Sequence, residues 1–226
     1  MAALFVLLLF LLVVAVQLWR SSRPGAVTPA PESPPPMRAD APTPQGVFLH
    51  DGHSWARLTP DGVVRVGIDR FLAEALGDAE SVELPPRGTS TRRGEPLFRV
   101  KAHGRWVDVP SPVDGEVVST HGDVATAPWS VTLDPYGVGW AVALHSRAIG
   151  SIKELRTGTQ ANAFIRDELK ALVEFLSRST RVGQQPVFAD AGVPPKGVTA
   201  ALDDKSWAGF CQRFVRSGQP GSDAQS

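Results

Sequence analysis

The sequence predicts a mainly β domain, a small sandwich or flattened barrel with C-terminal helices, which is preceded by a transmembrane helix. Three observations predict this fold class: an apolar run at the amino end, short β-like runs divided by Gly and Pro at about ten-residue spacing, and helical periodicity after Gly150. We expect four parts: a transmembrane signal anchor over residues 1–20, a Pro-rich linker over 21–46, a folded domain over 47–178, and a partly disordered tail over 179–226 with a short helix near 206–215.

The composition excludes several kinds of partner and site. The 226 residues carry 23 basic and 23 acidic side chains, and this formal net charge of zero argues against a nucleic-acid surface, which normally needs a basic excess. The single cysteine, Cys211, excludes an internal disulfide and a metal site with several Cys ligands. The five histidines are scattered singly, without the helical pair spacing of a zinc site: His50, His53, His103, His121 and His145. We therefore expect neither nucleic acid nor a metal ion as a ligand.

The first expected element is the apolar segment from Ala2 to Trp19, which contains no charge and one polar residue, Gln17. About 18 helical residues span roughly 27 Å, close to the hydrocarbon thickness of a bilayer. No basic residue precedes the run, so an uncleaved anchor is favoured over a cleaved signal peptide and over a buried core helix. Trp19 suits the membrane interface, and Arg20 and Arg23 place the rest of the chain in the cytoplasm. The prediction is a single-pass protein of the inner or cytoplasmic membrane.

The second element is the segment from Pro24 to Pro44, which is built mainly from Pro, Ala, Ser and Thr. This composition buries too little apolar surface to offset chain entropy, and its proline content favours a semi-extended polyproline II spacer. A plain spacer is favoured over a docking motif for a Pro-binding module.

The folded domain begins with a predicted hairpin. Residues 54–58 and 63–68 are rich in β-branched and other apolar side chains, and Thr59-Pro60-Asp61-Gly62 between them is a turn signal. A short helix is expected over Phe71–Leu76, because its apolar residues have helical spacing and Gly77 can close it.

A second predicted hairpin lies at the centre of the domain. Residues 97–102 and 105–109 alternate in polarity around His103-Gly104, which fits a two-residue turn with positive φ angles. Further strands are expected over 81–84, 115–118 and 140–144.

The pattern becomes helical after Gly150. Apolar residues at three- and four-residue steps predict an amphipathic helix whose apolar face lies on the core: Phe164, Ile165, Leu169, Leu172, Val173 and Leu176. In the tail, one face of the short helix near 206–215 would carry Trp207, Phe210, Cys211 and Phe214. Packing of this helix on its own domain is favoured over packing on a partner, and both remain open.

Several short motifs follow one another in a fixed order along the folded domain. They are His53-Ser54-Trp55, Val66-Gly67-Ile68, Ala75-Leu76-Gly77-Asp78, Val82-Glu83-Leu84-Pro85, Gly94-Glu95, Pro112-Val113-Asp114-Gly115-Glu116-Val117-Val118 and Asp134-Pro135-Tyr136-Gly137-Val138-Gly139-Trp140. Together and in this order they resemble the glycine cleavage H-protein family. The resemblance implies a lipoyl-type barrel-sandwich hybrid, in which two small antiparallel sheets are related by pseudo-symmetry and a hairpin displays one lysine.

The resemblance also implies where the chemistry of such a protein is carried. In the family the lysine at the hairpin tip is lipoylated, and the dithiolane arm carries an aminomethyl group between enzymes, so the cofactor supplies the chemistry. The family segment reads close to Glu-Ser-Val-Lys-Ala, and laid on this chain without a gap it puts Gly104 at the lysine position. The hairpin tip here is His103, Gly104 and Arg105, which could bind an anion or a partner or could simply close the hairpin.

Lys101 is the one lysine inside this hairpin, three positions before the expected place. Three positions along a strand correspond to about 10 Å and to the opposite face. We therefore predict an ordinary strand residue with a solvated amine and a doubtful lipoyl attachment site. The other lysines lie outside the hairpin: Lys153, Lys170, Lys196 and Lys205.

The predicted function is that of a membrane-anchored module of this kind which is not lipoylated and binds a protein partner, or acts as a scaffold, through its carrier-type surface. The alternative is a lipoyl carrier of a glycine cleavage-type aminomethyl-transfer system that uses Lys101. An enzyme is disfavoured, because the sequence shows no nucleophile–base set, no paired carboxylates, no metal spacing and no phosphate loop. Cys211 fits a half-buried structural thiol. We expect residues 2–19 to contact the membrane, and no cofactor except, in the alternative, lipoate.

Overall fold

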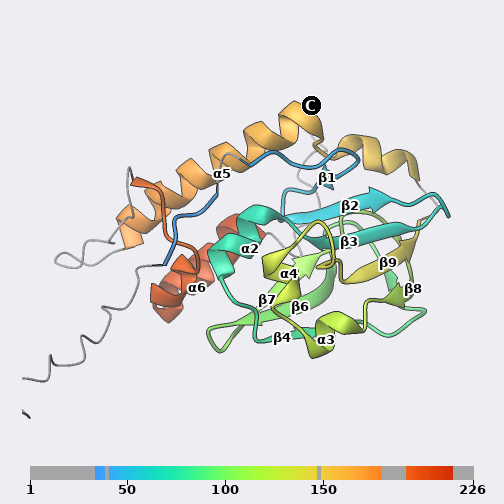
Figure 1. The fold of residues 1–226 in the computed structure, drawn as a ribbon, viewed down its shortest axis with the longest axis horizontal. Coiled ribbons are helices and arrows are strands. Elements are labelled where there is room, and N and C mark those ends of the chain that lie inside the picture. Colours follow the sequence, from blue (N-terminus) through green and yellow to red (C-terminus); the bar gives the residue numbers. More distant parts are fainter. Residues whose placement is uncertain (1–33, 39–40, 147–148, 180–191, 216–226) are drawn as a thin grey trace, which may run out of the picture. The chain divides into compact units, whose positions relative to one another are not determined.

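The computed structural model describes residues 34–38, 41–146, 149–179 and 192–215 (Figure 1). The predicted anchor over residues 1–20 lies outside them. Among the residues described, no helix is both long and apolar enough to cross a membrane. The anchor therefore stays a prediction.

The larger sheet has six strands in the order β1-β2-β3-β9-β8-β5, and each neighbouring pair is antiparallel. The predicted first hairpin is confirmed, since Trp55 of β2 lies opposite Gly67 of β3. A Cβ at Gly67 would come within 2.8 Å of the Trp55 indole nitrogen, so the glycine makes room for the buried ring. The strands are β1 (Phe48–Leu49), β2 (Ser54–Leu58), β3 (Val64–Ile68), β5 (Ser90–Thr91), β8 (Gly115–Thr120) and β9 (Val142–His145).

The smaller sheet has three strands in the order β4-β6-β7. They are β4 (Ser81–Glu83), β6 (Pro96–Ala102) and β7 (Arg105–Pro110), and both pairs are antiparallel. The second predicted hairpin is thus confirmed as β6–β7, with β6 as the central strand. The two antiparallel sheets agree with the mainly β fold class expected from the sequence.

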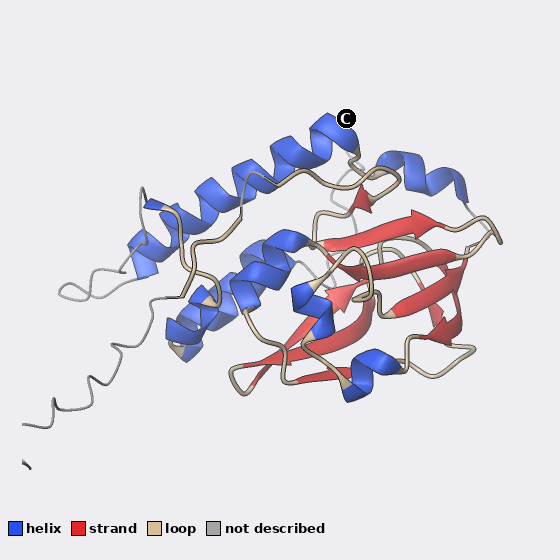
Figure 2. Ribbon diagram, viewed as in Figure 1, coloured by secondary structure: helices blue, strands red, loops and turns tan. Residues whose placement is uncertain are grey.

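The larger helices lie beside the strands (Figure 2). The predicted amphipathic helix is part of α5 (Gly158–Ser179), whose Ile165, Leu172 and Leu176 are buried as expected. The others are α2 (Arg70–Leu76), α3 (Asp123–Thr126), α4 (Ser130–Leu133) and α6 (Asp204–Phe210), with 3-10 turns at Ile149–Glu154 and Val198–Ala201 and a π-helical turn at Cys211–Val215. The sequence did not predict α3, α4, β1 or β5, because elements of two to four residues are too short to show a period.

His53 is a fully buried, titratable side chain in the core. Its Nδ1 lies 2.8 Å from Asp69 Oδ2, its Nε2 lies 3.9 Å from Glu168 Oε2, and its ring stacks on Phe71 and Phe164. Burial lowers the pKa of His53, but the charge and hydrogen bond of Asp69, with Glu168 adding to them, raise it to about 9. The protonated ring therefore joins the start of β2 to α2 and α5.

The same Asp69 begins helix α2. Its Oδ1 accepts the backbone N–H of Leu72 at 3.0 Å, as an N-cap carboxylate does. The predicted helix over Phe71–Leu76 is confirmed, and Gly77 ends it with a φ of 76°.

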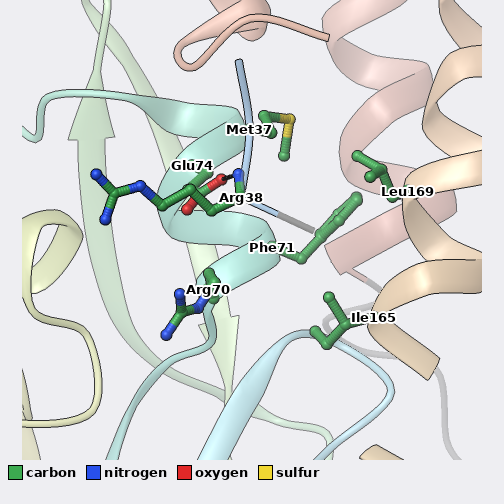
Figure 3. A pocket seen from close by; sticks show the side chains of 7 residues that line it. All are labelled: Met37, Arg38, Arg70, Phe71, Glu74, Ile165 and Leu169. Carbon is green, nitrogen blue, oxygen red and sulfur yellow. Dashed lines mark hydrogen bonds between the residues drawn. The ribbon is translucent and has the colours of Figure 1, made fainter. Parts of the chain in front are cut away.

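Part of the predicted linker packs on the domain instead of forming a free spacer. Met37 donates its N–H to Pro194 O, Lys196 donates to Pro35 O, and Pro36 forms a bridge with Pro195. Met37 lines a pocket together with Phe71 and the α5 residues Ile165 and Leu169 (Figure 3), and it is only 6% exposed. The prediction of a free spacer is wrong for residues 34–38, because the buried Met37 and the bridge between Pro36 and Pro195 offset the conformational entropy that ordering this segment costs. Composition alone could not reveal these contacts.

The end of the described chain also packs on this domain. Phe210 and Phe214 are buried, and Phe214 contacts the rings of Phe71 and Phe175. The helix predicted near 206–215 is thus α6 followed by the π-helical turn, and its apolar face lies on its own domain.

Candidate functional site

The tip of the β6–β7 hairpin is a two-residue turn. Ala102 pairs with Arg105, and His103 and Gly104 between them have φ angles of 51° and 73°. Two successive positive φ angles are typical of the tight turns that match strand twist. The predicted turn is therefore confirmed, and the apex carries an imidazole and a glycine.

Lys101 lies within the strand and not at the apex. It is opposite Trp106 of β7 on one side and Ser81 of β4 on the other. Its half-exposed side chain points to the outer face, since Val100 and Ala102 on either side of it are fully buried. Its Nζ lies 6.0 Å from the centroid of the Trp106 ring, on the same face as Arg99, whose guanidinium is 4.9 Å from that centroid.

The position that the family resemblance assigns to lysine is open but carries no amine. An ideal Cβ built on Gly104 meets no atom within 4 Å. The backbone N–H of Gly104 donates to both carboxylate oxygens of Glu80, at 3.1 and 3.2 Å. The glycine thus closes the turn and holds it against the chain segment that precedes β4.

His103 holds the turn against α2. Its Nε2 lies 2.9 Å from the carbonyl oxygen of Leu76, and because a carbonyl can only accept, Nε2 carries the proton. Leu76 is the last residue of α2, so its carbonyl is one of the groups that a helix end leaves without an intrahelical partner.

The chain beyond Gly192 satisfies two more of these carbonyls. Gly197 donates its N–H to Glu74 O at 2.7 Å, and Thr199 Oγ1 donates to Ala75 O at 2.9 Å. A Cβ on Gly77 would lie 2.8 Å from the Gly197 Cα, so the two glycines permit the close approach. The hairpin tip and the C-terminal segment together cap α2.

Arg105 connects the hairpin to the C-terminal segment. Its guanidinium donates to Leu202 O at 2.7 Å, lies 3.3 Å from Asp204 Oδ1, and sits 5.4 Å from the ring centroid of Trp207. We refer to these three residues and the chain between them, residues 202–207, as the tip cover. Sequence reasoning missed the tip cover: the aromatic face of the helix near 206–215 was visible, but no local signal links Leu202 to Arg105.

The thiol of Cys211 is unsuited to nucleophilic chemistry. Burial, and secondarily the charge of Asp108, raise its pKa to about 11, which the opposing effect of Arg105 does not offset. Among the described residues, no three or more His, Cys, Asp and Glu side chains are grouped so that they could hold a metal ion.

These contacts decide what the site can do. The resembled family displays a lysine at this tip, whereas here the apex carries no lysine and the turn is bonded to Glu80, Leu76 and the tip cover. Beside the exposed apex, the hairpin has an outer face on which Arg99 and Lys101 lie near the half-exposed Trp106. Arg99 is also paired with Asp108 and Glu83.

Comparison with known proteins identifies relatives of the folded part. The family model described as Glycine cleavage H-protein matches residues 48–168. Glycine cleavage system H proteins of Neisseria meningitidis and Methylococcus capsulatus are 37% and 38% identical to this chain over 108 and 112 residues. These matches cover 48% and 50% of this chain, and 84% and 87% of the two relatives.

A solved structure gives a further likeness. The crystal structure of a glycine cleavage system H protein from Mycobacterium marinum is 28% identical, with a TM-score of 0.48. The match covers 56% of this chain and 98% of that one.

Proposed function

The chain belongs to the glycine cleavage H-protein family. We propose that it is a member which does not carry lipoate and which acts as a membrane-tethered, protein-binding module. The fold of this family displays a cofactor for other enzymes and is not the fold of an enzyme. The observation that carries the proposal is Gly104 at the hairpin apex, with its N–H bonded to Glu80 and with His103 and Arg105 bonded to other parts of the domain.

The strand register supports a module without lipoate. To bring Lys101 to the apex, β6 would have to slip by three residues relative to β7, and an odd slip turns every side chain to the other face. Val100 and Ala102, which are fully buried, would then face solvent. The alternative carrier function through Lys101 would need this rearrangement.

The partner surface that we propose is the outer face of the hairpin, formed by Arg99, Lys101 and Trp106. Arg99 and Lys101 lie 4.9 and 6.0 Å from the centroid of the indole ring, and Arg99 is also paired with Asp108 and Glu83. Trp and Arg are among the residues that most often dominate the energy of protein interfaces. This face replaces the apex as the recognition element, because the tip cover occupies one side of the apex.

Residues 2–19 would hold the module at the inner or cytoplasmic membrane, with the folded domain in the cytoplasm. The uninterrupted apolar run and the arginines that follow it support this arrangement.

Intact mass spectrometry of the chain made in its native host tests whether it carries lipoate. We expect no lipoyl adduct on the parent and the same mass pattern in Lys101→Arg apart from the substitution itself. A lipoylated carrier made in the same host serves as the positive control. A lipoyl mass that the Lys101→Arg change removes would refute the proposal.

Site-specific photo-crosslinking tests the partner surface. A photoreactive side chain in place of Glu83, which is exposed beside Arg99, should capture one defined protein in the native host, whereas the same group in place of Lys170, which lies exposed on α5, should not. Equal capture from both positions, or capture from neither, would refute this surface.

A further inference from the structure

Three large apolar side chains form an exposed cluster on the connection between β8 and β9. Trp129, Leu133 and Val138 are 53%, 67% and 58% exposed, and they are three of the four exposed large hydrophobic residues in the part of the chain that the structure describes. They lie within ten positions of one another: Trp129 precedes the short helix α4 (Figure 1), Leu133 is its last residue, and Val138 follows it. We call these three residues the apolar patch.

The packing of helix α4 and the hydrogen bonds of the loop after it hold the three residues of the apolar patch in place. Helix α4 packs against α2 and β3 and buries Val131 and Thr132, which leaves Trp129 and Leu133, four residues apart, on the outward side. The Asp134 carboxylate accepts the N–H groups of Gly137 and Val138, at 3.1 and 3.2 Å. Asp134 thereby folds the loop back, so that Val138 lies beside the end of α4.

The segment that carries the patch has few charged residues of its own. Between Gly122 and Leu144 the only ionisable acids or bases, apart from Tyr136, are Asp123 and Asp134. Asp134 is committed to backbone donors, and Asp123 lies 3.5 Å from His121.

Neighbouring elements place two arginines against this segment. The Arg65 guanidinium lies 4.7 Å from the ring centroid of Trp140, and that of Arg70 lies 5.8 Å from the ring centroid of Tyr136. Surfaces that lie on a lipid interface combine Trp and Leu with neighbouring Lys or Arg. An exposed Trp, Leu and Val on a segment that two arginines contact therefore suit a lipid surface.

The proposed anchor would confine the domain near lipid. About 14 residues, Arg20 to Ser33, separate the apolar run from Pro34, and even as extended polyproline II they reach roughly 43 Å. That reach is comparable with the diameter of a domain of this size, so any face of the domain can meet the bilayer. Confinement raises the effective concentration of lipid, and a small patch then suffices.

We propose that Trp129, Leu133 and Val138 dock the domain on the lipid interface of the membrane that holds its anchor. The inference rests on the proposed anchoring of residues 2–19 and adds a second, reversible membrane contact to it. Trp129 would lie at headgroup depth, where indole rings are favoured, with Leu133 and Val138 beside it. Docking would fix which faces of the domain remain available to a partner.

Spin-label accessibility on the full chain tests the docking. The chain is reconstituted in vesicles of phosphatidylcholine and phosphatidylethanolamine, with Cys211→Ser to remove the native thiol and a nitroxide on Leu133→Cys. The matched control carries the label on Lys170→Cys, an exposed residue of α5. We expect the label at 133 to collide several-fold more with oxygen than with a water-soluble nickel chelate, and the label at 170 to show the reverse.

Two results would overturn the docking. A label at 133 that is as accessible to the nickel chelate as the label at 170 would place the patch in water. Low collision rates with both reagents, together with dipolar broadening between labels, would assign the patch to a second copy of the chain.

A charged variant makes the test independent of the label position. With the nitroxide on Val138→Cys, the additional change Leu133→Glu should return the label to water, and folding is preserved because Leu133 is already largely exposed. Carbonate extraction of the same vesicles reports on the anchor separately. Release of the chain would refute the anchoring proposal and the docking with it, whereas retention with a water-exposed label would refute the docking alone.

Discussion

The Nε2–H of His103 donates to the carbonyl oxygen of Leu76 at 2.9 Å, so the tip of the hairpin serves as a cap for the end of helix α2. Together with Gly197 and Thr199 it satisfies the last carbonyls of that helix. A tip used in this way is a fixed structural joint, which agrees with the absence of an amine from its apex.

The His103 bond can be removed without changing the turn. Asn tolerates the positive φ of 51° but is too short to reach Leu76 O, so His103→Asn should lower the free energy of unfolding by about 1 kcal/mol. Urea denaturation of residues 34–226, which group as one compact unit, measures the change. Lys101→Ala on the outer face is the control and should change stability by less than His103→Asn. Parent-like stability of His103→Asn would show that the bond contributes nothing.

Two glycines with positive φ differ in the cost of a side chain, because Gly77 also has a ψ of −126°, which L residues rarely adopt, and packs against Gly197. Gly77→Ala places a methyl group 2.8 Å from the Gly197 Cα at a φ of 76°, whereas Gly104→Ala meets nothing within 4 Å at a φ of 73°. We expect a loss of about 1 kcal/mol for Gly104→Ala and of about 3 kcal/mol for Gly77→Ala. Thermal or urea unfolding of the two variants checks this order, and equal losses would contradict the contact between Gly77 and Gly197.

The tip cover should depend on Arg105 and hardly on Asp204. Asp204 is fully exposed, so its ion pair contributes little, while the bond to Leu202 O and the packing on Trp207 are partly sheltered. Arg105→Met should therefore speed amide exchange in residues 204–215 by about tenfold or more, corresponding to roughly 1.4 kcal/mol of local stability. Asp204→Asn is the matched control and should exchange like the parent. Equal exchange in the parent and Arg105→Met would show that the guanidinium does not hold the cover.

The buried His53 should make stability fall at alkaline pH. Its pKa is raised from 6.5 to about 9 in the folded chain, so its contribution is complete below about pH 6.5 and disappears as the pH rises through 9. The contribution that is lost is on the order of 3 kcal/mol. Urea unfolding at several pH values between 6 and 10 should show this decline in the parent, and His53→Asn should show a flatter profile over the same range. A parent curve without any fall above pH 8 would contradict a charged His53.

Local chemistry was sufficient to predict much of the domain and the main feature of its site. The Pro-Asp-Gly turn before Val63, the Gly77 helix end and the His103-Gly104 turn are each set by a few adjacent residues, so their positions could be predicted before any contact was known. The same local register placed Gly104 at the apex and Lys101 inside a strand.

The cluster at His53 shows where local rules stop. A single histidine in a mixed sequence gives no sign of being buried, and its partners Asp69 and Glu168 lie 16 and 115 positions away. The β2–β3 hairpin brings Asp69 opposite His53, whereas only the tertiary packing of α5 brings Glu168 to the ring.

The sequence by itself determined that the hairpin exists, that its turn takes two residues and that no amine stands at its apex, because turn geometry depends on neighbours in the chain. The tertiary structure alone decided that this apex is bonded to α2 and that Arg105 beside it is bonded to the tip cover, and that residues 34–38 are packed instead of free. The bond from Arg105 to Leu202 spans 97 positions, and the bridge from Pro36 to Pro195 spans still more. Such contacts arise from the shape and burial of the whole domain, and no local period or motif records them.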